Sequence, residues 1–308
     1  MTLIIGFKCK EGVALVSDTK TTDLSTGEAL YEPKILAPLE NTPFIVGAAG
    51  YVNLCNEFTR KIPKIVTKRI AQMRIRNIQE LQKTGLSREK AIQNIRTQEK
   101  CVAINLKSVQ EVRNNECKNF EFDEQMIELP YVYSEEDLID DCENLVKKIN
   151  SQSKDTEESL ELLVGMRTST GIIHLHFISS DGVEDEINDY FAIGSGSPFV
   201  KTFFSRVYDF NKGMNELITQ AIRTILYVNI VAKENTVGYS SDFLPEAVII
   251  LNDGKYGKST FENELEVISD LEKEMEIFVD LIKQNKRKTL KPKIDSNIKI
   301  GLHPKYQT

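Results

Sequence analysis

The chain has 308 residues, of which 41% are hydrophobic and 28% charged, a composition typical of a soluble globular protein with one large domain or a domain plus an appendage. Its formal net charge of −7 argues against a general nucleic-acid binder and against a protein that binds anionic membranes. No apolar run reaches the ~18 residues of a membrane-spanning helix, and the N-terminus lacks the pattern of a signal peptide, so we expect a cytoplasmic protein.

The first fifty residues have the pattern of short strands joined by turns. Residues 2–7 and 13–18 are apolar strand segments, and residues 43–50 form a strand pattern that enters a glycine-rich turn. A helix is expected next, because apolar residues recur at helical spacing, with Pro63 kinking it or marking a boundary.

Residues 67–157 have a different, mainly helical character. A basic stretch over residues 60–76 contains no acidic residue, and a second stretch, over 135–143, is acidic. The second helix is expected to begin at Ser134, which starts an S-x-x-D pattern with Asp137. The basic and acidic helices either dock on each other or each present a charged face to water.

Strand patterns resume over residues 160–166 and 172–178. His174 and His176 alternate onto one face of the second strand, and no third ligand can be nominated, so we expect an exposed strand face rather than a metal site. A strand over 190–193 leads into the Gly194–Val200 segment, whose Pro198 suits the first turn of a helix. Helical spacing continues to residue 228, a strand covers 247–251, and the final segment has coiled-coil-like spacing.

The cysteines are scattered and odd in number, and none forms a C-x-x-C pair. We therefore expect reduced thiols rather than a disulfide framework or a zinc site, and no cofactor or metal is predicted. The five positions are Cys9, Cys55, Cys101, Cys117 and Cys142.

A threonine directly behind the initiator methionine is the most informative feature of the chain. Methionine removal is favoured when the second residue is small, so the mature chain is expected to begin with Thr2 and a free amine. A hydroxyl and an amine on one residue can act as nucleophile and base. Asp18, Lys34 and Gly50 follow in order along the sequence.

These features, together with the Val-Ser-Asp-Thr-Lys-Thr-Thr run at 16–22, the Ala49-Gly50 turn and the Gly194–Val200 segment, resemble a proteasome β-type subunit of the N-terminal nucleophile (Ntn) hydrolases. The resemblance covers roughly residues 2–56 and 159–256. It implies an α+β fold, the αββα four-layer sandwich, with an added helical insertion. The expected division is a core of residues 1–66 and 158–257, a helical insertion of 67–157 and a C-terminal helical extension of 258–308.

The resemblance also implies a role for each matching residue. Thr2 would be the nucleophile, with its own amine as the base. Lys34 would lower the pKa of the attacking group, and Asp18 would hold Lys34 in place. The Gly50 N–H would stabilise the oxyanion and Ser195 would hydrogen-bond the Thr2 amine. The remaining implied positions are Glu234, in place of a supporting Asp, and the substrate-binding residues Thr22, Ala48 and Val52.

One departure from the family pattern affects the expected chemistry. Family members that cut peptides carry a serine where this chain has Val237, just before Gly238. The leading expectation is a threonine-type peptidase or amidohydrolase that forms an acyl ester on Thr2. The alternatives are a connectase-like ligase or transpeptidase using the same ester, and a non-catalytic ring or scaffold subunit. The expected partners are a peptide or protein substrate and further copies of the chain, as a homo-oligomer or a proteasome-like ring.

Overall fold

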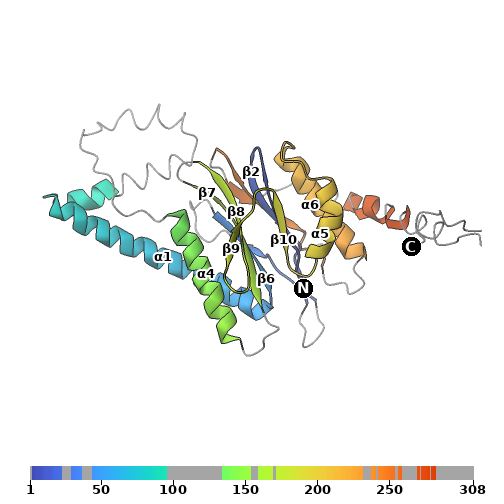
Figure 1. Ribbon diagram of the computed structural model, residues 1–308, viewed down its shortest axis with the longest axis horizontal. Helices are drawn as coiled ribbons and strands as arrows, with labels where there is room; N and C mark the ends of the chain where they lie inside the picture. The colour runs from blue at the N-terminus through green and yellow to red at the C-terminus, as the bar shows by residue number, and fades with distance from the viewer. Residues whose placement is uncertain are drawn as a thin grey trace, which may run out of the picture.

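The protein, described here by a computed structural model, consists of two stacked β-sheets between two layers of helices (Figure 1). The structure describes residues 2–22, 29–36, 44–95, 134–153, 159–168, 171–231, 237–240, 242–253, 256–258, 269–270, 272–277 and 279–281. Among the helices within these ranges, none is long and apolar enough to cross a membrane. The predicted α+β sandwich is confirmed.

The first sheet carries the N-terminus of the described chain. Its strand order is β10-β1-β2-β11-β12, and all neighbouring strands are antiparallel. Its strands are β1 (Ile4–Cys9), β2 (Gly12–Ser17), β10 (Tyr190–Ile193), β11 (Glu246–Leu251) and β12 (Tyr256–Lys258). The two N-terminal strands are buried almost throughout, which explains why their sequences are continuous apolar runs rather than alternating ones.

The second sheet has the order β5-β6-β7-β8-β9 and is also antiparallel. Its strands are β5 (Ile35–Leu36), β6 (Phe44–Gly50), β7 (Leu160–Arg167), β8 (Ile173–Ile178) and β9 (Glu184–Glu186). A separate two-stranded ribbon, β3 (Lys20–Thr22) and β4 (Ala29–Tyr31), connects the first sheet to the second. Lys34 therefore lies where the chain passes from one sheet to the other.

A dry apolar layer fills the space between the two sheets. Ile4 and Leu15 of the first sheet pack against Ile45 and Leu163 of the second, and all four side chains are fully buried. Gly47 allows the close approach, because a Cβ at this position would lie 2.9 Å from a methyl group of Ile4. The sheets are thus held together by shape as well as by apolar burial.

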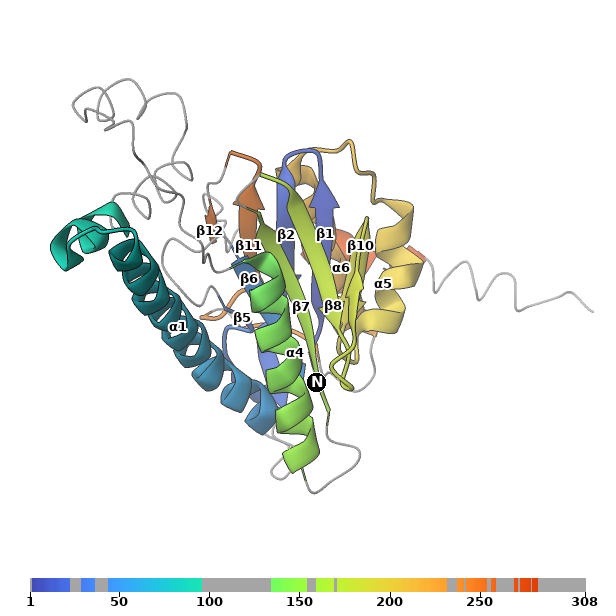
Figure 2. The ribbon, with the colours of Figure 1, turned by 60° about the vertical axis from the view of Figure 1, so that its left-hand side comes forward.

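Helices cover the outer face of each sheet (Figure 2). The first sheet is covered by α5 (Ser197–Phe203), the short 3₁₀ helix η2 (Phe204–Arg206) and α6 (Met214–Val231). The second sheet is covered by α1 (Val52–Lys83) and α4 (Glu135–Gln152).

The two helices on the second sheet account for several sequence predictions. Pro63 does not end α1, which continues past it to Lys83. The predicted start of α4 is confirmed: the Ser134 hydroxyl accepts the Asp137 N–H and the Asp137 carboxylate accepts the Ser134 N–H. The basic and acidic helices meet within one chain, because the Arg69 guanidinium pairs with Asp137 at 2.9 Å and with Asp141 at 2.6 Å.

The division into a core and a helical insertion of 67–157 stays a prediction. The segment assigned to the insertion nevertheless contains α4, whose Val146 and Ile149 are buried in the same apolar cluster as Leu162 of β7. The helical layer over the second sheet thus contains residues of both the predicted core and the predicted insertion.

The two histidines lie on one face of β8, as predicted, but this face is partly buried rather than exposed. The rings of His174 and His176 stack with centroids 5.6 Å apart, and their Nδ1 atoms contact the carboxylates of Glu186 and Glu184 on β9. No group of three or more metal-ligating side chains occurs among the described residues. Cys9, Cys55 and Cys142 are free thiols, whereas Cys101 and Cys117 lie outside the described residues.

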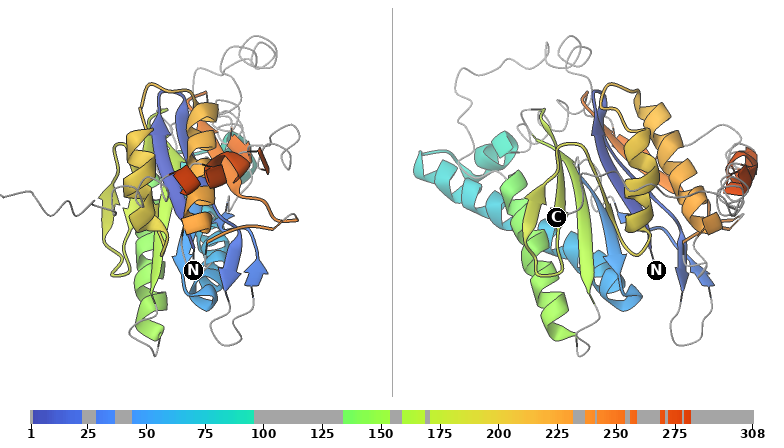
Figure 3. Two further views of the ribbon diagram at one scale, coloured as in Figure 1. Left: turned by 90° about the vertical axis from the view of Figure 1, so that its right-hand side faces the viewer. Right: turned by 45° about the vertical axis from the view of Figure 1, so that its right-hand side comes forward.

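Part of the C-terminal segment packs beside α6 (Figure 3). Met275 is buried in the apolar cluster between the first sheet and its helices. The Arg223 guanidinium of α6 donates to Glu274 at 2.9 Å, and the Tyr239 hydroxyl donates to Glu272 at 2.7 Å. The other residues of the predicted coiled-coil-like pattern (Leu265, Ile268, Leu271, Phe278, Ile282) lie outside the described residues or have undescribed side chains.

Replacement of Asn150 by alanine should lower the free energy of unfolding by about 2 kcal/mol, because it leaves partly buried backbone groups without partners. The Asn150 amide accepts the Leu160 N–H at 3.0 Å and donates to the carbonyls of Leu160 and Ser180, so it ties the end of α4 to β7 and to the turn after β8. Chemical denaturation measures the change. Ser151→Ala is the matched control, since the exposed Ser151 hydroxyl only contacts the Lys148 carbonyl; an equal loss in both variants would contradict the prediction.

Candidate active site

A buried carboxylate organises the N-terminal end of the first sheet. Asp18 is fully buried, and its Oδ1 accepts the Leu3 N–H at 2.8 Å and the Lys34 ammonium at 2.8 Å. Its Oδ2 accepts the Gly238 N–H at 3.1 Å. The single side chain thus joins the N-terminus, the lysine and the loop that precedes β11, as a buried charge requires.

Lys34 is held at both its side chain and its backbone. Besides Asp18, its Nζ donates to the Lys20 carbonyl, and only 5% of the side chain is exposed. Its backbone carbonyl accepts the Ala48 N–H at 3.3 Å, and its N–H donates to Glu246 at 2.8 Å. Burial lowers the pKa of the Lys34 amine below its ordinary value, while the Asp18 carboxylate opposes that shift.

Thr2 lies against a glycine turn that follows β10. Gly194 has a φ of +86°, and a Cβ there would lie 2.1 Å from the Thr2 carbonyl oxygen, so a residue with a side chain cannot fit without displacing Thr2. The Gly196 N–H donates to the same carbonyl at 3.4 Å. The backbone of Thr2 is therefore fixed from one side by this turn and, through Leu3, from the other by Asp18.

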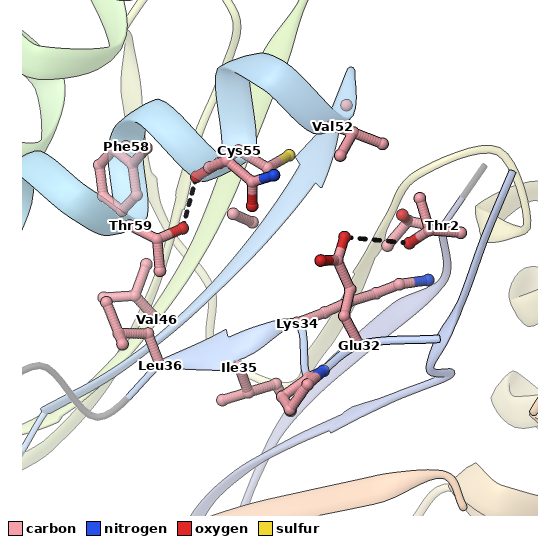
Figure 4. Close-up of a pocket in the computed structure, with 15 residues that line it drawn as sticks. Thr2, Glu32, Lys34, Ile35, Leu36, Val46, Val52, Cys55, Phe58 and Thr59 are labelled. Carbon is pink, nitrogen blue, oxygen red and sulfur yellow. Dashed lines mark hydrogen bonds between the residues drawn. The ribbon is translucent and has the colours of Figure 1, made fainter. Parts of the chain in front are cut away.

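Thr2 and Lys34 line one cavity of about 210 Å³ (Figure 4). The apolar part of its wall comes from strands β5 and β6 and helix α1: Ile35, Leu36, Val46, Ala48, Val52 and Phe58. Polar groups line another part, where the Thr21 hydroxyl donates to the Glu32 carboxylate at 3.4 Å. Gly50 lies at the rim with a φ of +142°, and its Cβ position is occupied by the Ser159 carbonyl.

The nucleophilic side chains that line the cavity include Thr2, Thr21, Thr59 and Cys55. The hydroxyls of Thr21 and Thr59 donate to the Glu32 carboxylate and to the Cys55 carbonyl. Burial raises the pKa of the Cys55 thiol to about 12, so at neutral pH it is not the thiolate that cysteine chemistry requires. The Thr2 hydroxyl is therefore the stronger candidate for covalent chemistry in this cavity.

The loop before β11 explains the departure at Val237. The Val237 side chain is fully buried in the apolar cluster around α6 and lies near the Gly196 position. The next residue, Gly238, contacts the site through its backbone, donating to Asp18 and accepting the N–H groups of Thr19 and Lys20. Glu234 lies outside the described residues.

The structure brings most of the residues predicted for the site together. Thr2, Lys34, Gly50, Ala48 and Val52 line one cavity, and Asp18 lies directly behind Lys34. Ser195 is exposed in the turn against Thr2, and Thr22 is the last residue of β3. Sequence reasoning missed Thr21, Glu32 and Glu246. Because side chains alternate between the two faces of β3, the sequence could have indicated Thr21 as a site residue. No local sequence pattern indicates that Glu246 belongs to the site.

The chain was compared with known proteins by sequence and by structure. A family model described as "Proteasome subunit" matches residues 131–237. No curated protein matches the sequence. Among solved structures, the Anbu (Gly-1) mutant from Hyphomicrobium sp. strain MC1 aligns with a TM-score of 0.60 and 12% identity, over 94% of this chain and 99% of that one.

A second solved structure, Anbu (ancestral beta-subunit) from Yersinia bercovieri, aligns with a TM-score of 0.57 and 14% identity, over 92% of this chain and 97% of that one. The chain has the fold of a proteasome-type subunit. The resemblance noted from Thr2, Asp18, Lys34 and the glycine turns is therefore confirmed at the level of fold. Since Anbu aligns over nearly its whole length, the shared fold extends beyond the segment that the family model matches.

Replacement of Gly194 by alanine should lower the free energy of unfolding by at least about 2 kcal/mol more than replacement of Gly85 by alanine. Both glycines have a similar positive φ, +86° and +93°, so the backbone strain of the two variants is matched. Only at Gly194 does the new Cβ collide with backbone, whereas nothing lies within 4 Å of the Gly85 position. Equal losses in chemical denaturation would show that the turn does not clamp Thr2.

Proposed function

We propose that the protein is a threonine-type hydrolase that forms an acyl ester on Thr2 after Met1 is removed. The observation that carries the proposal is the shared cavity of Thr2, Lys34 and Gly50, with Lys34 held by the buried Asp18. The proteasome-type fold and the position of Thr2 just before β1, the first strand of the chain, support the proposal.

The proposed reaction uses groups already at the site. The Thr2 Oγ attacks a substrate carbonyl while the α-amine freed by Met1 removal accepts the hydroxyl proton; an α-amine with a pKa of ~7.7–8.0 suits this task near neutral pH. The Lys34 ammonium stabilises negative charge developing beside it, and the Gly50 N–H is the candidate donor to the oxyanion. The leaving amine takes a proton as the C–N bond breaks, and water then hydrolyses the Thr2 ester to a carboxylic acid.

The cavity wall indicates the class of substrate. Leu36, Val46, Ala48 and Phe58 present apolar surface to the same cavity that Thr2 lines. A hydrophobic side chain next to the scissile carbonyl would bury itself there at about 25 cal/mol per Å² of apolar area. We therefore propose peptide or protein substrates with an apolar residue at the cleaved bond.

A ligase or transpeptidase is a second candidate, favoured by the position of Val237. Its side chain is buried in the core, so this position supplies no hydroxyl next to the nucleophile. An incoming amine, rather than water, would then resolve the Thr2 ester. Both candidates share the first half of the reaction.

Protein produced in cells should lose Met1 and should then react with a peptide epoxyketone, an electrophile that requires both a hydroxyl and a free amine. Intact mass is expected to show a chain that begins at Thr2 and gains one inhibitor per chain. Thr2→Ser, which keeps both groups, should still react, whereas Thr2→Ala should not. A chain that keeps Met1, or an adduct that persists in Thr2→Ala, would refute Thr2 as the nucleophile. A processed chain without an adduct would favour a non-catalytic subunit.

A peptide amide with leucine before the cleaved bond should yield mainly the free acid, even with a competing amine peptide present. In ¹⁸O-water the acid should carry one ¹⁸O atom, because water resolves the ester. Mass spectrometry of the products measures the ratio of acid to amide, with Thr2→Ala as the blank. A predominant amide product would instead assign the protein as a transpeptidase.

A further inference from the structure

Glu246, the first residue of β11, is a buried carboxylate for which the proposed reaction has no use. Only 4% of the residue is exposed, although glutamate is seldom buried in proteins. Its Oε1 accepts the Lys34 N–H at 2.8 Å and the Ile35 N–H at 3.0 Å, and the Ser17 hydroxyl lies at 3.4 Å. A buried carboxylate with these partners does more than fill space, because each contact restrains a part of the site.

The partners of Glu246 lie next to Asp18 on one side and at Lys34 on the other. Ser17 pairs with Glu246 in the β2–β11 register and directly precedes Asp18. Lys34 precedes Ile35, the first residue of β5, which belongs to the other sheet. One carboxylate thus connects the end of β2, next to Asp18, to Lys34 at the start of the second sheet.

The backbone of Lys34 depends on this contact. Pro33, just before it, has no N–H, and β5 is only two residues long. On the other side, the Lys34 carbonyl accepts the Ala48 N–H at 3.3 Å. Without Glu246, the N–H groups of Lys34 and Ile35 would lose their acceptor. The backbone of Lys34, from which its side chain reaches Asp18, would then be less restrained.

We propose that Glu246 is a positioning residue that sets the Lys34 ammonium beside Thr2 by holding the Lys34 backbone. Rates in the cavity would depend on it because a displacement of about 1 Å in a catalytic group can cost on the order of 100-fold. The kinetic part of this inference rests on the proposed role of Thr2. The structural part does not, since it concerns two backbone amides.

The kinetic test measures epoxyketone labelling of processed protein in Glu246→Ala and Glu246→Gln. The alanine variant should lower the maximal labelling rate by about tenfold or more, because the Lys34 amine is displaced. Inhibitor affinity should stay within about twofold, because the apolar wall from β6 and α1 (Val46, Ala48, Val52, Phe58) has no contact with Glu246. The glutamine variant should recover most of the rate, since its amide oxygen can accept the same two N–H groups. A wild-type rate in Glu246→Ala, or no recovery in Glu246→Gln, would overturn the proposal.

Two controls separate positioning from other effects. Lys258→Ala removes the lysine whose Nζ lies 4.0 Å from Glu246 Oε2 and should label at the wild-type rate, because the Oε1 contacts persist. Asn150→Ala destabilises the other helical layer and, where it is fully folded, should also label normally. A loss of rate in either control equal to that of Glu246→Ala would count against the proposal.

Hydrogen exchange tests the structural part without catalysis. In a peptic peptide covering residues 33–36, the amides of Lys34 and Ile35 should exchange at least about tenfold faster in Glu246→Ala than in wild type, and near the wild-type rate in Glu246→Gln. Unchanged protection would overturn the proposal whatever the labelling shows. A further outcome is that wild-type protein does not label, while the amides of Lys34 and Ile35 exchange faster in Glu246→Ala. This outcome would refute the proposed function but would support the proposal that Glu246 positions the Lys34 backbone.

Discussion

The site depends on the placement of an aspartate where water cannot reach it. Asp18 directly follows β2, a strand whose residues are all buried, and is itself fully buried, so its carboxylate has to find partners within the protein. It finds them in Leu3, Lys34 and Gly238, which come from three separate parts of the chain. Removing a partner from such a group costs more than forming the contact gains. The placement of Asp18 therefore links the order of three parts of the chain: the N-terminus, the lysine and the loop before β11.

This dependence explains how much of the site could be read from the sequence. Thr2, Asp18 and Lys34 lie within 33 residues, and the resemblance to a proteasome β-type subunit predicted that they meet. Glu246 contacts the same lysine from 212 positions away, and its place depends on β11 pairing with β2, which no local pattern reveals. Val237 looked like a deficiency of the site, but its side chain belongs to the apolar cluster around α6.

The fold was predictable for a related reason. Continuous apolar strands, a capping box at Ser134 and helical stripes each have a local signature, and together they indicate sheets covered by helices. The extent of α1 was left open, because Pro63 predicts either a kink or a boundary although the helical spacing continues beyond it. Burial of Ile62 and Val66 on either side of the proline, against the second sheet, outweighs that signal.

The length of α1 has a mechanical consequence. At 1.5 Å per residue its 32 residues extend about 48 Å, roughly twice the length of the seven-residue strand β6 beside which it begins. The outer turns pack instead on the helical residues 88–95, through a small cluster of Leu81, Ala91 and Ile95 that is separate from the apolar clusters of the sheets. Figure 2 shows this arm leaning away from the sheets. The buried contacts of this outer part of α1 are thus separate from those of the four layers around Thr2, and local stability depends on such local contacts.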